Sequence, residues 1–475
     1  MTTTLPSGAV VEIGAHVRVC DGGRILVGGT PTRLVRLSER ALRFLRDGRI
    51  TLVDPPSARL AERLLALGMA HPVLALLPPH DPAEVTVVVP VRDRARELDR
   101  LLAGIGRRTQ VIVVDDCSRD SAAVARVAAS HSARLVVLPE NRGPAAARND
   151  GLRHVRTRYV AFADSDIVIG QDTIPMLLRH FHDQHLAVVA PRVLGLESRR
   201  AGANWIARYE SARSSLDLGP HAALVHPRSR VSWVPSAFLL ARTDALGPGF
   251  TESMRVGEDV DLVWRLAAEG RRVRYEPAVT VRHEHRTRFT DWLGRKAYYG
   301  SGAHALYERH GPAVAPAALT PWAAGAAVAL LAQRRWSVPV AAVMVVWAGC
   351  GYRRKVPEGS GGPNRLAVRL TGLGLAATAE QTMGMLLRHW WPVTLAGCVF
   401  SARVRRAAAL AAVTDGFLEY HLRSPQMDPV RFALARRLDD LAYGAGLWAG
   451  AVRARSVRSL LPTLRGPGHG SRTTR

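Results

Sequence analysis

From Val85 onward the chain alternates between short apolar runs and longer segments of helical length. A buried strand of a parallel sheet reads as a continuous apolar run, because helices cover both faces of the sheet. The alternation therefore predicts an α/β domain built on a parallel sheet. The expected strands are Val85–Val89, Val111–Val114, Leu135–Leu138 and Tyr159–Ala163, and the clearest helices between them are Ala95–Ile105 and Pro144–Val155.

The same domain is expected to continue beyond Gly170 and to occupy residues 81–300. A helix and a strand near Ala187–Ala190 come first, and a less regular region follows. Val231–Phe238 is then expected to form a strand with small residues. A helix is expected to open at Gly257 with three acidic residues and to end at Gly270.

Residues 1–80 have a different pattern, with short alternating runs and glycine pairs that predict a small α+β unit. Two short helices are expected, one capped by Ser38 and ending near Gly48, the other capped by Ser57 and ending at Gly68. The unit resembles the winged-helix modules of PqqD type, which hold peptide precursors in peptide-modification pathways. A structural appendage is the alternative. The expected strands are Val10–Ile13, Val17–Val19 and Ile25–Val27, and residues 78–82 read as a linker.

The last third of the chain is apolar, and residues 301–450 are expected to be helical and membrane-associated. Ala313–Ala332 carries no charge and has roughly the length that crosses a bilayer, and Trp336–Tyr352 is a second apolar run. A membrane hairpin would place Arg334 and Arg335 outside, against the positive-inside rule, so segments lying on the cytoplasmic face of the cell membrane are the alternative. Residues 451–475 are expected to form a basic, disordered tail.

Charge and cysteine content narrow the class of protein. The chain has 65 Lys and Arg against 40 Asp and Glu, a formal charge of +25, which suits nucleic acid, anionic lipid or phosphorylated substrates. Aromatic residues make up only 6%, and no stacking motif emerges, so a nucleic-acid-binding protein is a remote alternative and no nucleic-acid partner is expected. The four cysteines lie far apart, which argues against a zinc site or disulfide framework. No signal peptide, dinucleotide-binding fingerprint or P-loop is apparent.

Carboxylates follow two of the predicted strands directly. Asp164 and Asp166 come after the strand that ends at Ala163, and Asp115 and Asp116 end the strand near Val114. Ligands of open α/β sheets bind beyond the carboxyl ends of the strands. Asp164 and Asp166 could share Mg²⁺ or Mn²⁺, which prefer oxygen ligands, and the alternative is an acidic turn with Asp166 as a helix cap.

Further candidate residues have equally clear alternatives. Glu258 and Asp259 open a helix, where an acid can serve as a general base or simply stabilise the helix dipole. His283 and His285 could ligate a metal or belong to a polar turn. Arg148 suits phosphate, because guanidinium binds phosphate bidentately, but it could also be an exposed helix residue.

Five motifs between Val85 and Arg288 together resemble the family 2 glycosyltransferases of GT-A fold, which are inverting enzymes that use nucleotide sugars. In order they are VVVPVRDR, VIVVDDCSRD, NRGPAAARNDGL, FADSD and GEDVDLVWRLAAEG. The resemblance implies that Asp164 and Asp166 hold Mn²⁺ or Mg²⁺ on the diphosphate of a UDP-sugar donor, with His283 or His285 completing the shell. It also implies that Asp259 is the base, with Glu258 beside it. The implied substrate-binding residues are Pro90, Val91, Arg92, Asp93, Asp115, Asp116, Arg148, Asp164 and Trp233.

Within the family, the chain most resembles the members that add β-1,4-linked glucose, from UDP-glucose, to a peptide-derived redox cofactor. A small peptide-derived acceptor is therefore expected. The rival within the same class is a transferase that builds cell-wall or lipid-linked polysaccharide. Processive members carry Gln-x-x-Arg-Trp, and here Gln333-Arg334-Arg335-Trp336 is one residue short, so long-chain processivity is not expected.

Overall fold

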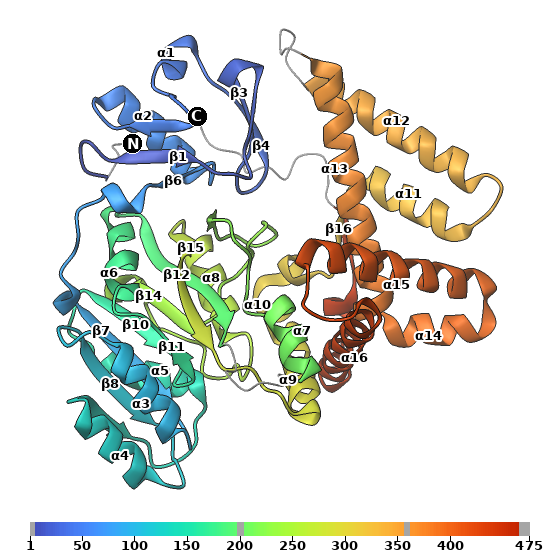
Figure 1. Cartoon of the computed structure of the whole chain (residues 1–475). Helices are drawn as coiled ribbons and strands as arrows, with labels where there is room; N and C mark the ends of the chain where they lie inside the picture. The colour runs from blue at the N-terminus through green and yellow to red at the C-terminus, as the bar shows by residue number, and fades with distance from the viewer. Residues whose placement is uncertain (1–4, 197–203, 356–361, 465–475) are drawn as a thin grey trace. The chain divides into compact units, whose positions relative to one another are not determined.

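The computed structural model describes residues 5–196, 204–355 and 362–464. The chain divides into two compact units (Figure 1). Unit 1 comprises Met1–Arg199 and Ser214–His285, and unit 2 comprises Arg200–Arg213 and Arg286–Arg475. Unit 2 therefore starts at Arg286, before the boundary at residue 300 drawn from the sequence, and also includes a short segment from the middle of the chain.

A nine-stranded sheet forms the core of unit 1, in the order β11-β15-β12-β14-β10-β7-β8-β9, with β13 paired to β15. Strands β10, β7, β8 and β9 are parallel, as predicted, whereas β14 is antiparallel to β10. The strands are β7 (Val85–Val91), β8 (Gln110–Asp115), β9 (Arg134–Val137), β10 (Tyr159–Ala163), β11 (Ile167–Val168), β12 (Leu186–Gly195), β13 (Ala223–Leu224), β14 (Phe238–Arg242) and β15 (Arg272–His283).

Helices cover both faces of this sheet. Val87 and Val89 of β7 share a core cluster with Leu98 of α3, while Gly151 of α5 lies against Val88 so closely that a Cβ there would overlap it. Successive strand residues point to opposite faces, so α3 and α5 pack on opposite sides. The helices of unit 1 in this region are α3 (Ala95–Gly104), α4 (Ser121–Ser130), α5 (Pro144–Arg153), α6 (Thr173–Leu178) and α8 (Glu258–Ala268).

The predicted strand at Val231–Phe238 is wrong, because β14 begins only at Phe238. Pro235 has no N–H to give to a ladder. The next residue, Ser236, donates its N–H to the Oδ2 of Asp259 at 3.2 Å. This segment therefore runs to a carboxylate of α8 rather than pairing with a neighbouring strand.

The N-terminal part of unit 1 contains two small sheets, β5-β1-β6 and β2-β3-β4, around a separate core. Ser38 caps a helix as predicted, but that helix, α1, ends at Leu42. The second helix, α2, begins at Pro55 with Asp54 as its cap, and Ser57 instead completes a capping box, so the cap predicted at Ser57 is wrong. The elements are β1 (Val10–Ile13), β2 (Arg18–Cys20), β3 (Ile25–Gly28), β4 (Arg33–Arg36), α1 (Glu39–Leu42), β5 (Arg49–Thr51), α2 (Pro55–Ala66) and β6 (Ala70–Pro72).

Buried charges fasten this N-terminal part to the large sheet. Arg272 of β15 contacts Glu62 of α2 and also donates to Asp183 at 2.8 Å. All three side chains are at most 10% exposed. Breaking a buried pair of this kind is costly, so residues 1–80 form part of one unit with the sheet.

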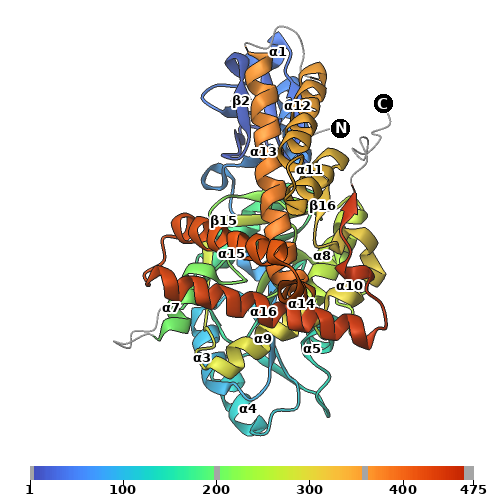
Figure 2. The ribbon, with the colours of Figure 1, turned by 90° about the vertical axis from the view of Figure 1, so that its right-hand side faces the viewer.

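In its described residues, unit 2 is helical apart from a short parallel pair, β16 with β17. Helices α11, α12 and α13 lie side by side, as do α15 and α16 (Figure 1, Figure 2). The elements are α7 (Trp205–Arg213), α9 (Phe289–Ser301), α10 (Ala303–His310), β16 (Ala318–Leu319), α11 (Pro321–Ala332), α12 (Ser337–Lys355), α13 (Pro363–Gly384), α14 (Trp391–Phe400), α15 (Ala402–Arg423), α16 (Pro429–Arg453) and β17 (Thr463–Leu464).

The apolar run at 313–332 does not form one continuous helix, because α11 starts at Pro321 and is 12 residues long. Among the residues that the structure describes, no helix is both long enough and apolar enough to cross a membrane. In the segment predicted as a tail, residues 454–464 contain a short 3-10 helix at Arg458–Leu460 and strand β17. Residues 465–475 lie outside the described residues.

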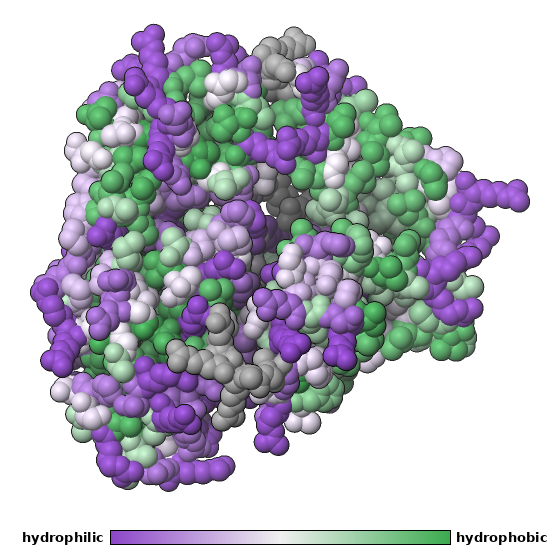
Figure 3. All heavy atoms as spheres, in the orientation of Figure 1, coloured by the Kyte–Doolittle hydropathy of each residue, from purple (hydrophilic) through white to green (hydrophobic). Residues whose placement is uncertain are grey.

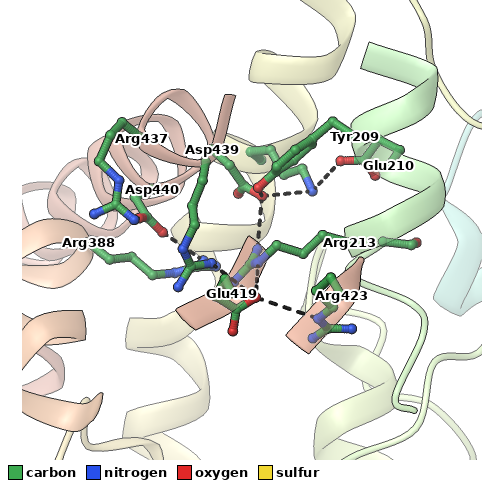
Figure 4. A network of polar contacts seen from close by, with 12 residues as sticks. Tyr209, Glu210, Arg213, Arg388, Glu419, Arg423, Arg437, Asp439 and Asp440 are labelled. Atoms are coloured by element: carbon green, nitrogen blue, oxygen red, sulfur yellow. Dashed lines mark hydrogen bonds and ion pairs between the residues drawn. The ribbon is translucent and has the colours of Figure 1, made fainter. Parts of the chain in front are cut away.

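A network of charged side chains, buried at its centre and partly exposed at its border, joins α7, α9, α15 and α16, and we call it the α16 network (Figure 4). Asp439 of α16 accepts a hydrogen bond from Tyr209 at 3.0 Å and lies 3.3 Å from both Arg213 and Lys296. The network thereby ties α7 and α9 to α16. Its carboxylates are Glu210, Glu419, Asp439 and Asp440, and its cations are Arg213, Lys296, Arg388, Arg423 and Arg437.

Candidate active site

The candidate residues follow strands that end at one edge of the sheet. Strand β7 pairs in parallel with both β8 and β10, so the carboxyl ends of all three strands meet there. Asp115 is the last residue of β8, and Asp164 directly follows β10. Pro90 and Val91 are the last residues of β7, and Arg92 is exposed beyond them.

Asp115 and Asp116 are buried, and their carboxylates bind backbone and hydroxyl groups of this chain. Asp115 accepts from the N–H of Ser118 at 3.0 Å and from the Ser121 hydroxyl at 2.5 Å. Asp116 accepts from the N–H groups of Arg142 and Gly143 at 2.7 and 2.9 Å. Both residues therefore fix the loops that border the edge.

Asp93 lies at the rim of the same edge, in the left-handed region with φ 57°. It accepts from the N–H of Arg119 at 2.7 Å, and its own N–H donates to the Ser118 hydroxyl. The loops after β7 and β8 are thereby joined, and the Asp93 side chain remains partly exposed.

Arg148 is buried between two carboxylates and is not an exposed helix residue. Its guanidinium donates to Asp164 at 2.6 Å and to Glu258 at 3.0 Å, and only 2% of Arg148 is exposed. Burial opposes the charge, but Asp164 and Glu258 outweigh it and hold the pKa of Arg148 above its usual range. Arg148 therefore links the strand edge at β10 to the start of α8.

Asp166 is contacted by Arg94 and lies 3.5 Å from the Nε2 of His283. The pairing of β11 with β15 sets Ile167 opposite His283, which brings the imidazole to the carboxylate. Burial opposes ionisation of Asp166, but His283 and Arg94 outweigh it and hold the pKa of Asp166 below its usual range. The Asp166 carboxylate is thus charged near neutral pH.

The four predicted metal ligands are not gathered in one preformed cluster. Within the described ranges, no three His, Cys, Asp or Glu side chains come together in a way that could hold a metal. Asp164 pairs with Arg148, Asp166 with Arg94 and His283, and His285 lies against Gly195 with its ring 6.2 Å from that of His283. The reason is electrostatic, because arginines hold the two carboxylates.

The donor chemistry of this edge nevertheless fits a hard divalent cation. Asp164 is 32% and Asp166 15% exposed at the side chain, and His283 adds an imidazole beside Asp166. Carboxylates and imidazole suit Mn²⁺, and carboxylates with phosphate oxygens suit Mg²⁺. Asp164, Asp166 and His283 are therefore the residues that could hold the cation, with His285 next to them.

Asp259 sits at the start of α8 and makes no ion pair in the part of the chain that the structure describes. Its carboxylate accepts from the N–H of Ser236 at 3.2 Å and from its neighbour Val260 at 2.8 Å. Burial and the adjacent Glu258 charge raise the pKa of Asp259 to about 7. A carboxyl with such a pKa can take a proton near neutral pH, as a general base must.

Sequence reasoning missed three residues of this edge: Arg94, Asn149 and Phe250. Asn149 exchanges two hydrogen bonds of 2.8 Å with the backbone of Phe250, and the Phe250 ring lies 5.2 Å from the Arg148 guanidinium. The loop that precedes α8 is thus held on α5. Asn149 follows Arg148 directly in the ARND motif, which was the available signal, whereas Phe250 carries none.

Trp233, expected at the substrate, is partly buried in the extended segment before β14. The carbonyl of its neighbour Ser232 accepts from the Trp264 indole at 2.6 Å, which ties this segment to α8. The segment that carries Trp233 also supplies the Ser236 N–H to Asp259.

Comparison with known proteins adds to this geometry. The sequence model of Glycosyl transferase family 2 matches residues 86–221, and that of Glycosyl transferase family group 2 matches residues 159–400. The pre-mycofactocin glycosyltransferase of Mycobacterium tuberculosis (strain CDC 1551 / Oshkosh) is 41% identical over 476 residues, which cover 98% of this chain and 99% of the relative.

Two other similarities are partial. The poly-beta-1,6-N-acetyl-D-glucosamine synthase of Staphylococcus aureus (strain COL) is 27% identical over 186 residues, covering 38% of this chain and 44% of the relative. The solved mannosyltransferase PcManGT from Pyrobaculum calidifontis, in complex with GDP-Man and Mn2+, is 21% identical with a TM-score of 0.36, covering 64% of this chain and 89% of that one. At this TM-score the structural likeness is weak.

Proposed function

The chain belongs to the family 2 glycosyltransferases of GT-A fold, and from that premise we propose that it glucosylates premycofactocin, the peptide-derived redox cofactor precursor. UDP-glucose is the proposed donor, and the product carries β-1,4-linked glucose added with inversion. The observation that carries the proposal is the 41% identity to a pre-mycofactocin glycosyltransferase over 98% of this chain. The alignment therefore includes most of residues 1–80, which resemble a peptide-holding module.

Membership of family 2 was expected from five motifs in the sequence and is confirmed, as is the resemblance to the mycofactocin-system members. The rival acceptor, a cell-wall or lipid-linked glycan, is supported by a narrower match. The poly-beta-1,6-N-acetyl-D-glucosamine synthase aligns with only 38% of this chain. We therefore place the glycan acceptor second.

In the proposed reaction Asp259 acts as the base. A single displacement with inversion needs one group that removes the proton of the acceptor hydroxyl. Asp259 suits this role because its pKa is raised to about 7 and it forms no ion pair in the described chain. The N–H groups of Ser236 and Val260 hold its two oxygens in place.

The donor side is proposed to lie at Asp164 and Asp166. These carboxylates, with His283 or His285, would hold Mn²⁺ or Mg²⁺, which stabilises the negative charge of the departing diphosphate. Arg148 keeps Asp164 oriented through its 2.6 Å bond. Pro90 to Asp93, Asp115 and Asp116 shape the loops proposed to receive the uridine, with Trp233 on the segment next to Asp259. The reaction is proposed to occur at the cytoplasmic face of the cell membrane.

UDP release with premycofactocin as acceptor tests the proposal. We expect release from UDP-glucose to require Mn²⁺ or Mg²⁺ and the acceptor to gain one or more hexose masses. Asp259→Asn and Asp164→Ala are expected to abolish both signals. Asp172→Asn is the matched control, because Asp172 is exposed and its carboxylate caps no helix.

The outcomes separate the parts of the proposal. If UDP release depends on the metal but only a glycan acceptor gains mass, the enzyme class stands and premycofactocin is rejected as the acceptor. Release from another UDP-sugar alone would reject glucose. An anomeric product with retained configuration would reject single displacement by Asp259.

A further inference from the structure

Helix α12 presents an apolar face to solvent. Val338, Val343, Val346 and Trp347 are each 64–70% exposed. Val343, Val346 and Trp347 are spaced three and four apart and lie on one side of the helix, away from the buried Ala341 and Ala348, and Val338 borders that side. Residues 337–348 contain one polar side chain, that of Ser337, and it is only 3% exposed. The outer side of this helix therefore offers a continuous apolar surface, which we call the α12 face.

The opposite side of α12 is already occupied by packing. Ala341 and Ala348 are 6% and 5% exposed, and Ala348 belongs to a cluster with Trp322 and Ala323 of α11. Figure 3 shows apolar side chains gathered over the part of unit 2 where α11 and α12 lie in Figure 1. The exposed valines are thus in excess of what unit 2 uses for its own core, and a large apolar patch of this kind marks an interaction surface.

Basic residues stand at both ends of the α12 face. Arg334 and Arg335 are exposed just before the helix, and Arg354 is exposed in its last turn. The whole segment from Gly311 to Thr414 holds eleven Arg and Lys against two acidic residues, Glu358 and Glu380. An apolar stripe framed by arginine fits a surface that is apolar within and anionic at its boundary.

We propose that the α12 face docks in the plane of an anionic phospholipid bilayer. The valines and Trp347 would enter the boundary between headgroups and acyl chains, where tryptophan is favoured. The arginines at the ends would contact lipid phosphates, which guanidinium binds in bidentate fashion. A second copy of this chain is a poorer partner, because it would bring the same arginines against these. The proposal rests on the membrane location proposed above and assigns it to one surface of unit 2, but it does not depend on the donor, the acceptor or the transfer reaction.

Co-sedimentation of the full-length protein with vesicles tests this proposal. We expect binding to equimolar phosphatidylcholine and phosphatidylglycerol and much weaker binding to phosphatidylcholine alone. Val343→Glu with Trp347→Glu should lower the partition coefficient at least tenfold, since charges are costly in the interface. Arg334→Gln with Arg335→Gln should lower it about fivefold per arginine on the anionic vesicles only.

As a matched control, vesicle binding of the single variant Val53→Glu is compared with that of the single variant Val343→Glu. Both valines are 68% exposed, but Val53 lies in the N-terminal part of unit 1. We expect Val53→Glu to bind vesicles like the parent. Circular dichroism and UDP release without vesicles should stay unchanged in all variants, because none of these residues belongs to the candidate active site.

Two results would overturn the proposal. One is equal vesicle binding by the Val343→Glu, Trp347→Glu double variant and the parent. The other is concentration-dependent dimerisation of the parent that the double variant loses while neither protein binds vesicles. The second result would assign the α12 face to another copy of the chain.

Discussion

Each of the two units contains a cluster of charged side chains with a buried centre, and the clusters differ in how their carboxylates are paired. In the α16 network every carboxylate has a cation within 3.3 Å. At the sheet edge of unit 1, Arg148 serves Asp164 and Glu258, whereas Asp259 has backbone N–H partners but no ion pair in the described chain.

The pKa values of Asp439 and Asp259 follow this difference, whereas at Asp440 burial outweighs the neighbouring arginines and raises the pKa. Burial opposes ionisation of Asp439, but Lys296, Arg388 and Arg213 outweigh it and lower the pKa of Asp439. Asp259 is the more exposed of the two, yet burial and Glu258 raise its pKa to about 7. Matched charges hold helices together, while a carboxylate without its own cation is available to accept a proton.

The largest effect is expected from removing the carboxylate without a cation. Asp259→Asn keeps the shape of the side chain but cannot take a proton from the acceptor. General bases contribute about 10²–10⁴-fold to rate, so kcat should fall by that factor. Single-turnover kinetics would measure the rate, and a binding titration would measure the affinity for the donor. An unchanged donor affinity with lost turnover supports the role, and full activity would contradict it.

The second prediction breaks the shared cation at the same edge. Arg148→Met leaves Asp164 and Glu258 without their common partner, and removing one member of a buried pair costs about 3–5 kcal/mol. Urea unfolding of the full chain would measure the loss. The double variant Arg148→Met, Glu258→Gln should recover part of it, because one uncompensated charge is then gone. If the double variant recovers no stability, the loss in Arg148→Met comes from the missing packing of Arg148 on Phe250 and not from the unpaired charges.

Most of the sheet could be predicted because a buried strand of a parallel sheet has a continuous run of apolar residues in the sequence. Strands β7, β8, β9, β10 and β12 lie within a few residues of their expected positions. The expected strand at Val231–Phe238 failed because its residue pattern does not reveal that the Ser236 N–H binds Asp259. Ser57 failed as a cap because two prolines after Asp54 start the helix earlier.

The candidate site was predicted as a set of residues but not as a set of pairs. The motifs identified Asp115, Asp164 and Asp259 as candidates, because each lies at the end of a predicted strand or at the start of a predicted helix. That Arg148 lies between Asp164 and Glu258, 110 residues from Glu258 in the chain, depends on how α5 and α8 pack. The α16 network, whose members are scattered from Glu210 to Asp440, has no local signal at all.

The third prediction removes a shared cation from the α16 network. Lys296 is 4% exposed and lies 2.8 Å from Glu210 and 3.3 Å from Asp439. Lys296→Met should destabilise unit 2 by about 3 kcal/mol, the low end for a broken buried pair, because both acids keep other donors. For a unit of this size, Arg200–Arg213 with Arg286–Arg475, that loss lowers the melting temperature by roughly 6–12 °C. At low temperature kcat should stay at the parent value. A kcat loss like that of Asp259→Asn would remove the distinction between the clusters.

The smallest effect is a gain in stability that increases as the pH rises. The pKa of Asp259 is about 7 in the folded chain against a usual value of 3.8, so the folded state binds this proton more tightly than the unfolded state. Stability contributed by Asp259 is therefore present near pH 4 and lost as the pH rises toward 7. Asp259→Asn should stabilise the protein at pH 8 by about 1–2 kcal/mol, allowing for partial exposure, and by less at pH 5.5. Melting curves of both proteins at the two pH values would measure the difference. An equal or opposite shift would mean that Asp259 bears no excess electrostatic cost, and that its chemistry must come from the bound substrates.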